Sequence, residues 1–277
     1  MRIAIMGETR FPVLPYGSGG LGRTTHDIAT GLLRLGHKVT IYSPEGGEFE
    51  GSITKDVHPE WYDVFLDFSH DHSWQFDKVL HLIGDKECKY QPPCAVVQSE
   101  YMRTFYPSAK LVPAGVNVDE IPFSKEHGDY LVFAGANISH KQPSVARDIA
   151  RDAGKELRML GPEFEVVTED EKNKIIGHAL GLLCPYLMDA APRLPLEAAA
   201  CGTPTICLDG DGTKEHVVDL VTGFVCESME EMTETVILLG GLDRERIRSW
   251  VSQNHNNRLE IPQIEHLLEV VRDGEKW

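Results

Sequence analysis

The sequence predicts an α/β protein of two domains, each built on a parallel β-sheet with helices on both faces. Short apolar runs alternate with segments of helical period along the whole chain, a pattern typical of parallel sheets. The alternation restarts near the middle of the chain, and 277 residues are enough for two modest hydrophobic cores.

The first half opens with a strand over residues 2–7, followed by a loop and a helix over 21–35. Ile28 and Leu32 share one face of that helix, and Gly36 marks its end. The remaining strands of this half are predicted at 38–42, 62–68, 78–83, 94–98 and 111–113.

The second half begins again with an apolar strand over 130–135 that ends in glycine. Helices are then predicted at 143–153, at 170–178 and around Glu197, with strands at 157–160, 180–185 and 205–208. A run of helices completes the chain, and the last of them spans 261–271.

Composition excludes several classes of partner. A formal net charge of −16 opposes non-specific binding to nucleic acid or to an anionic membrane. No apolar run reaches the roughly 18 residues of a membrane span, and the chain starts directly with a strand, so we expect a cytoplasmic protein. The six cysteines form no close ligand pair and are expected to be reduced thiols.

The most informative motif covers residues 197–204, Glu-Ala-Ala-Ala-Cys-Gly-Thr-Pro, with Asp189 eight residues before Glu197. This arrangement resembles the donor-site module of glycosyltransferase family 4. The resemblance implies two Rossmann-like domains with parallel sheets facing across a cleft, the GT-B fold, and a nucleotide-sugar donor. Because a carboxylate can accept hydrogen bonds from two vicinal hydroxyls, we expect Glu197 on the ribose and Asp189 on the sugar. Leu196, directly before Glu197, is also expected at the donor.

The same resemblance sets the predicted domain boundaries. Residues 112–119 are similar to the family's inter-domain linker. We expect an acceptor-side domain over 1–122, a nucleotide-sugar-binding domain over 123–257, and a final helix within 258–277 that crosses back to the first domain. The chain resembles a shortened member, because the stretch from Gly161 to Glu171 lacks a strand-helix element.

A glycine-rich segment, residues 17–23, opens the first predicted helix. Glycines let a backbone approach phosphate, and a helix N-terminus attracts it. By resemblance Gly19 and Gly20 face the cleft and are expected to contribute to donor binding. A dinucleotide site and a purely structural turn are the alternatives; the dinucleotide fingerprint should follow the first strand directly, but residues 8–16 intervene.

The second phosphate contact is predicted at Lys141, the lysine position of the family's Gly-Arg-x-x-x-x-Lys-Gly motif. Ala136 occupies the arginine position, so one cation is missing. Arg193 is the candidate replacement, since guanidinium groups bind phosphate in a two-pronged manner. The alternative places Arg193 in solvent in the first turn of the Glu197 helix.

Histidines near the ends of first-half strands are further candidates. His72 ends a segment that resembles the family's strand-ending His-x-His. His81 lies two residues before Ile83, which occupies the place of the family histidine that touches the donor sugar. Both are candidate catalytic residues, and a structural role is the alternative for each. A zinc site formed by His70, His72 and His81 lacks a convincing fourth ligand. The Asp-x-Asp at 209–211 matches a divalent-ion motif, but Asp-Gly pairs are ordinary turn residues, so no metal is expected.

The resemblance implies a retaining, metal-free hexosyl transferase that uses a nucleotide sugar such as a UDP- or GDP-sugar and needs no other cofactor. The acceptor, an unknown sugar, glycan or small molecule, enters beside Gly19, Gly20 and the histidines. Two alternatives remain. One is a degenerate protein of the same fold that binds a nucleotide sugar or glycan without transfer, and the other is a nicotinamide-dependent oxidoreductase.

Overall fold

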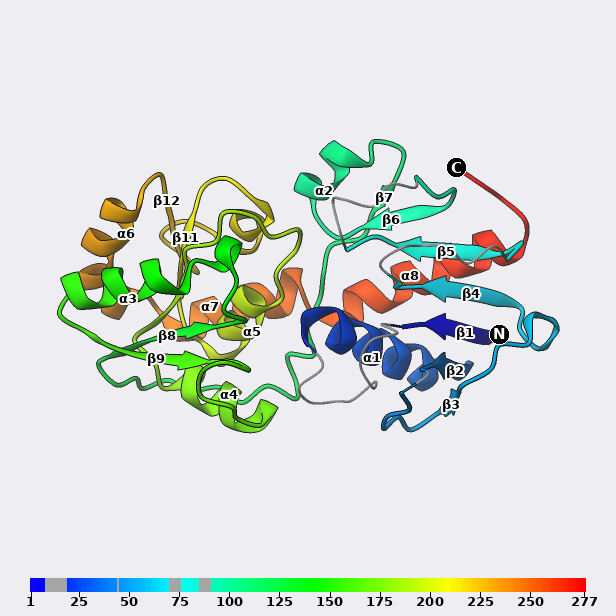
Figure 1. Ribbon diagram of the computed structural model, residues 1–277, viewed down its shortest axis with the longest axis horizontal. Coiled ribbons are helices and arrows are strands. Elements are labelled where there is room, and N and C mark those ends of the chain that lie inside the picture. The colour runs from blue at the N-terminus through cyan, green and yellow to red at the C-terminus, as the bar shows by residue number, and fades with distance from the viewer. Residues whose placement is uncertain (8–18, 44, 70–75, 85–90) are drawn as a thin grey trace. The chain divides into compact units, whose positions relative to one another are not determined.

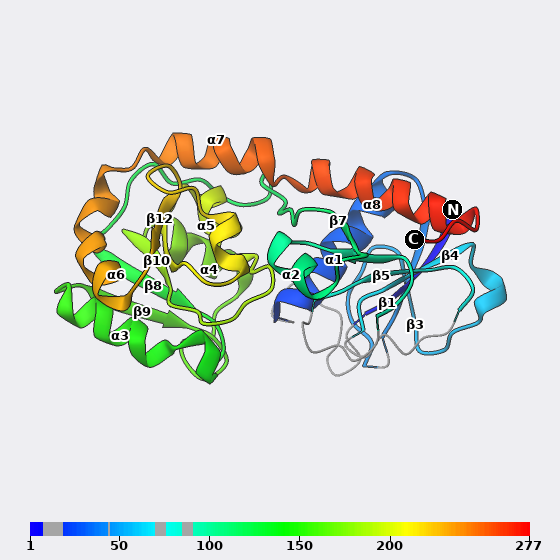
Figure 2. The same ribbon diagram turned by 90° about the horizontal axis from the view of Figure 1, so that it is seen from above.

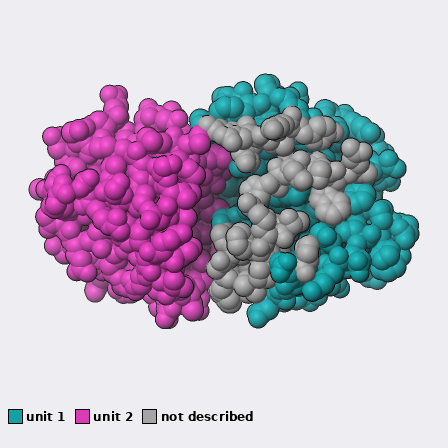
Figure 3. Space-filling model, viewed as in Figure 1, with its two compact units in different colours: residues 1–115, 257–277 teal, residues 116–256 magenta. Residues whose placement is uncertain are grey.

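The computed structural model describes residues 1–7, 19–43, 45–69, 76–84 and 91–277 (Figure 1). The chain divides into two compact units, which Figure 3 shows in different colours. Met1–Gly115 and Asn257–Trp277 form the first unit, and Val116–Asn256 forms the second. The first segment of the first unit therefore ends at Gly115, whereas the sequence placed the boundary after residue 122.

The first unit is built on a seven-stranded parallel sheet of order β3-β2-β1-β4-β5-β6-β7. Its strands are β1 (Arg2–Met6), β2 (Lys38–Tyr42), β3 (Ser52–Thr54), β4 (Val64–Asp67), β5 (Val79–Leu82), β6 (Ala95–Val97) and β7 (Lys110–Leu111). Its helices are α1 (Gly19–Arg34), the 3₁₀ turn η1 (Pro59–Trp61), α2 (Glu100–Phe105) and α8 (Asn257–Arg272). The strand order reverses between β1 and β4, so a ligand is expected at their carboxyl ends.

Helix α8 supplies a large part of the first unit's core although it comes from the far end of the chain (Figure 2). Ile264 and Leu268 are fully buried with Ile28 and Leu32 of α1 and with apolar side chains of β1, β4 and β5. Burying one such side chain contributes about 1.5–3 kcal/mol. The apolar spacing of this final helix therefore fixes it on the first unit.

The second unit is built on a five-stranded parallel sheet of order β12-β11-β10-β8-β9. Its strands are β8 (Tyr130–Ala134), β9 (Glu156–Leu160), β10 (Gly181–Cys184), β11 (Thr205–Leu208) and β12 (Gly223–Cys226). Its α-helices are α3 (Pro143–Asp152), α4 (Glu169–Gly177), α5 (Leu194–Cys201), α6 (Met229–Thr235) and α7 (Arg244–Asn254). Its 3₁₀ turns are η2 (Ser139–Lys141), η3 (Gly212–His216) and η4 (Val236–Gly241).

The predicted α/β class with two parallel sheets is confirmed. Strands β3 and β12 and helix α2 were not predicted, because each is short and lacks a periodic apolar pattern. In the fully described stretch between β9 and α4 there is no further strand or helix, and β9 is the edge strand of its sheet. The five cysteines among the described residues are free and buried.

Candidate functional site

The second sheet brings two polar loops together where its strand order reverses. β8 lies between β9 and β10 in the sheet. The chain leaves β8 toward β9 on one side and leaves β10 toward β11 on the other, so the two loops start side by side and lead away in opposite directions. Open α/β sheets bind ligands at such a point. Lys141, in η2 after β8, and Asp189, in the loop after β10, meet there.

Lys141 and Asp189 form an ion pair between Nζ and Oδ2. Both side chains are 19% exposed, so the pair can be reached from solvent. The Lys141 ammonium also lies 3.9 Å from the centre of the buried Tyr186 ring, a cation–π contact that holds it in place. The structure thus places the two predicted residues side by side, a fixed cation next to a carboxylate. Ala136, in the predicted arginine position, adds no charge.

Glu197 belongs to a second cluster, formed where α4 packs on α5. Its Oε2 accepts a hydrogen bond of 2.7 Å from Lys172 Nζ, and the same ammonium lies 2.5 Å from Glu169 Oε1. Burial lowers the pKa of Lys172, but the two carboxylates outweigh it, so that its pKa lies above the ordinary value. Lys172 is therefore a fixed cation. The side chain of Leu196 is fully buried, which leaves only its backbone for a ligand.

Arg193 is 7% exposed, so its alternative placement in solvent is wrong. Its Nε lies 3.7 Å from Glu197 Oε1. The position is fixed by the neighbouring peptide, because Pro192 accepts a 2.8 Å hydrogen bond from Nδ1 of the buried His216. The structure groups Arg193 with Glu197, and its predicted role on the diphosphate remains a prediction.

The buried His216 predicts a pH dependence of stability. Burial, with the nearby His255 and Arg193, lowers its pKa from 6.5 to about 4. Between these values the unfolded chain binds a proton that the folded protein does not, so the free energy of unfolding falls as the pH falls. We expect the free energy of unfolding of His216→Gln to fall by about 2–3 kcal/mol less than that of wild type when the pH is lowered from 7.5 to 4.5. Urea titrations at the two pH values measure this difference. Equal losses would contradict this.

The Asp-x-Asp segment at 209–211 forms a turn after β11. Asp209 pairs with Lys214 at 2.5 Å, and Asp211 caps η3 through a 2.7 Å hydrogen bond from the Thr213 amide. Burial raises the pKa of Asp211. Gly212 is required here, because its Cβ would lie 2.0 Å from the Ala190 carbonyl oxygen. In the described part of the chain no group of His, Cys, Asp and Glu side chains is arranged to hold a metal ion.

In the first unit His81 is held by a buried carboxylate at the sheet's own switch point. Its Nδ1 is 2.9 Å from Asp67 Oδ2, and Asp67 Oδ1 accepts hydrogen bonds from Ser69 N and Oγ at 2.8 and 2.6 Å. Asp67 and His81 are register partners on β4 and β5. His72 and His70 lie outside the described residues, so the structure does not place them.

Gly19 and Gly20 begin α1, and the segment before them lies outside the described residues. Among the described residues, nothing lies within 4 Å of a Cβ placed on Gly20, so their packing does not demand glycine there. Gly31 on the same helix differs, because its Cβ would lie 2.6 Å from Ile261 Cγ1 of α8.

These two glycines make a matched pair of variants. We expect Gly20→Ala to keep or slightly raise the melting temperature, because alanine favours a helix, while lowering ligand binding at the helix N-terminus about tenfold. Gly31→Ala should lower the free energy of unfolding by about 1–2 kcal/mol through overpacking against α8. Thermal melts and nucleotide titrations of both variants check this. An unchanged nucleotide affinity of Gly20→Ala would show that Gly20 does not contribute to the binding site.

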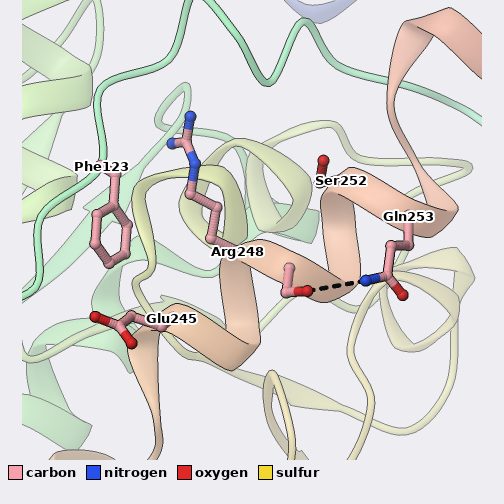
Figure 4. Close-up of a pocket in the computed structure, with 6 residues that line it drawn as sticks. Phe123, Glu245, Arg248, Ser252 and Gln253 are labelled. Carbon is pink, nitrogen blue, oxygen red and sulfur yellow. Dashed lines mark hydrogen bonds between the residues drawn. The ribbon is translucent and has the colours of Figure 1, made fainter.

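A separate pocket lies on α7, away from these clusters in the sequence (Figure 4). It is lined by Phe123, Glu245, Arg248, Ser249, Ser252 and Gln253. Arg248 donates to the carbonyl oxygens of Ile121, Ala200 and Val118, so its guanidinium braces the chain that enters the second unit. This pocket contains none of the predicted site residues.

The sequence did not single out three residues of these clusters, Asp67, Glu169 and Lys172. Glu169 and Lys172 are three residues apart on α4, a spacing that predicts an ion pair but not its contact with α5. Asp67 closes β4, and an acidic residue at the carboxyl end of a buried strand could have been read as a site residue.

Solved structures show which fold this is. The glycosyltransferase AviGT4, involved in avilamycin A biosynthesis, matches with a TM-score of 0.79 and 18% identity over 100% of this chain and 99% of its own. Sucrose-phosphate synthase from Thermosynechococcus elongatus matches at 0.73 and 12%, over 99% and 100%. HepE of Anabaena, in complex with UDP and glucose, matches at 0.72 and 11%, over 97% and 99%.

The fold is therefore GT-B, the two-domain fold of these glycosyltransferases. Residues 126–249 match the family model of glycosyl transferases group 1. The stretch contains the Lys141–Asp189 pair and the Glu197 cluster. No curated protein matches the chain. None of the helices among the described residues has the length and apolarity to cross a bilayer.

Proposed function

We propose that this protein transfers a hexose from a nucleotide-sugar donor, such as a UDP- or GDP-sugar, to a hydroxyl of an acceptor. The observation that carries the proposal is the Lys141–Asp189 pair at the switch point of the second sheet, on the chain segment that leads into Glu197 and α5. A cation and two carboxylates in sequence suit a diphosphate flanked by two polyhydroxylated rings.

In this proposal Lys141 holds the diphosphate, Asp189 accepts hydrogen bonds from the sugar, and Glu197 binds the ribose. Lys141 stabilises the charge that develops on the leaving phosphate, and such preorganised groups are among the largest contributions to catalysis. Arg193 compensates for Ala136 by turning from Glu197 to the diphosphate. These cations take the place of a divalent metal.

The acceptor side of the proposal rests on the first unit. Gly19 and Gly20 at the start of α1 and the buried Asp67–His81 pair both lie at the carboxyl end of its sheet. The acceptor, an undetermined sugar, glycan or small molecule, binds there. Transfer retains the anomeric configuration, and the leaving phosphate oxygen accepts the proton of the attacking hydroxyl. We also propose that the protein is cytoplasmic.

A panel of UDP-, GDP-, ADP- and TDP-sugars tests the proposal. Thermal stabilisation by one donor, together with slow release of its nucleoside diphosphate, is the expected result, because glycosyl donors react with water when the acceptor is absent. Lys155→Ala is the control variant, since it breaks a Lys–Asp pair with Asp129 beside the opposite end of β9. Absence of stabilisation by every donor would contradict the proposal.

The second candidate is a protein of the same fold that binds the donor without transfer. Ala136 favours it, because one lost cation removes about 2–4 kcal/mol of transition-state stabilisation by analogy with a lost oxyanion donor. Pro192 favours it too, because proline has no N–H to offer a phosphate. Stabilisation by a donor with no release of nucleoside diphosphate, in the presence of candidate acceptors, would select this function.

A further inference from the structure

The cluster between α4 and α5 contains more charge than the packing of the two helices requires. The cluster consists of two carboxylates and two cations, and none of the four side chains is more than 19% exposed: Glu169, Glu197, Lys172 and Arg193. Ion pairs that are taken out of water gain little over apolar residues of similar volume. The helices α4 and α5 already pack against one another, and Ile176 on α4 and Ala198 on α5 are fully buried.

The ammonium of Lys172 changes what Glu197 can do with a ligand. Its 2.7 Å hydrogen bond occupies one position on Oε2, and a carboxylate offers about four positions for hydrogen bonds. The other carboxylate oxygen, Oε1, lies 3.7 Å from Arg193 Nε. Lys172 carries three N–H donors, of which Glu197 and Glu169 take two. The Glu197 carboxylate, an acceptor, and the Lys172 ammonium, a donor, thus lie in direct contact, 2.7 Å apart.

Two adjacent hydroxyls of a ribose are complementary to such an arrangement. One hydroxyl donates to the Glu197 carboxylate, and the oxygen of the other accepts from the Lys172 ammonium. A carboxylate alone offers only acceptors, so it needs both hydroxyl protons turned toward it. Hydrogen bonds to charged groups are stronger than neutral ones, so the loss of one hydroxyl is costly.

We propose that Lys172, together with Glu197, is a specificity-determining residue that selects a ribonucleoside diphosphate donor over its 2′-deoxy counterpart. The inference rests on the proposed function, which places the ribose at Glu197. It adds a residue on α4 to the site and assigns it a hydrogen bond to the 2′-hydroxyl oxygen. Glu169 is a positioning residue, because its contact holds the Lys172 ammonium.

The test compares the affinities of UDP with 2′-deoxy-UDP and of GDP with 2′-deoxy-GDP by calorimetric titration. Wild type should bind the ribonucleotide at least about tenfold more tightly, the loss expected for one charge-assisted hydrogen bond. Lys172→Met should bring the ratio of the two affinities close to one. The control Lys174→Met, on the exposed face of the same helix, should keep the wild-type ratio.

A ratio of affinities separates recognition from a structural role, because a general loosening of α4 weakens both nucleotides alike. If Lys172→Met does not fold, the double variant Glu169→Gln, Lys172→Met removes one charge of each sign and keeps the cluster balanced. It should also abolish the preference, whereas Glu169→Gln alone should retain most of it. A wild-type ratio near one, or an unchanged ratio in the Lys172 variants, would overturn this inference alone. Binding of neither nucleotide would overturn the proposed function and this inference with it.

Discussion

Lys141→Ala is expected to lower kcat/KM for donor cleavage by about 10²–10³-fold and to weaken nucleoside diphosphate binding about tenfold or more. The ammonium is fixed between Asp189 and the Tyr186 ring, so no reorganisation is needed when charge develops on the leaving phosphate. The pair is partly exposed, and such pairs contribute only about 0–1 kcal/mol to folding. The melting temperature should therefore change little.

Three measurements on Lys141→Ala check this result: steady-state kinetics with the active donor, calorimetric titration with its nucleoside diphosphate, and a thermal melt. Lys155→Ala serves as the matched control, because it also breaks a Lys–Asp pair of the second unit. We expect its kinetics to match those of wild type. Comparable losses in both variants, or a Lys141→Ala protein with full activity, would show that Lys141 does not contact the diphosphate.

Asp189→Asn is expected to lower kcat/KM by about 10²-fold without weakening the binding of free nucleoside diphosphate. The carboxylate is assigned to the sugar, so a ligand without the sugar does not need it. In the absence of a ligand Asp189 neutralises Lys141. Its replacement leaves the ammonium unpaired, and the diphosphate should bind equally well or more tightly.

The affinity for nucleoside diphosphate distinguishes the two variants, because Lys141→Ala should weaken it whereas Asp189→Asn should not. Asp209→Asn is the matched control, since that carboxylate pairs with exposed Lys214 in the nearby turn after β11. If Asp189→Asn loses nucleoside diphosphate affinity as Lys141→Ala does, the assignment of Asp189 to the sugar is wrong.

Much of the fold could be predicted because its strands are buried on both faces. The runs that became β1, β8 and β11 are almost continuously apolar, and their ends were predicted to within one or two residues. β3 has three residues and lies at an edge, and β12 opens with a glycine. Neither has the length or the pattern that identifies a strand from sequence.

The part of the candidate site that follows from the order of the strands along the chain could be predicted from the sequence. Lys141 and Asp189 each follow a predicted strand, and parallel strands bring their carboxyl ends to one edge of the sheet, so their meeting follows from topology. The contact of Lys172 with Glu197 depends instead on how two helices pack. Neither residue's local sequence encodes that contact.

Contacts between buried side chains were another part of the site that the sequence alone could not predict. Arg193 looked equally suited to solvent, but His216 holds the preceding peptide and the guanidinium is buried beside Glu197. His81 was identified as a candidate, but its partner Asp67 was not, because their contact requires the register of β4 and β5. Such partners become visible only once the sheet is assembled.

The most direct test of the central claim is a crystal structure with the nucleoside diphosphate of the active donor. We predict a phosphate oxygen within hydrogen-bond distance of Lys141 Nζ and the ribose hydroxyls against Glu197 and Lys172. A nucleotide bound elsewhere, for example in the pocket on α7 around Phe123 and Arg248, with Lys141 still paired to Asp189, would contradict the assignment of the donor site.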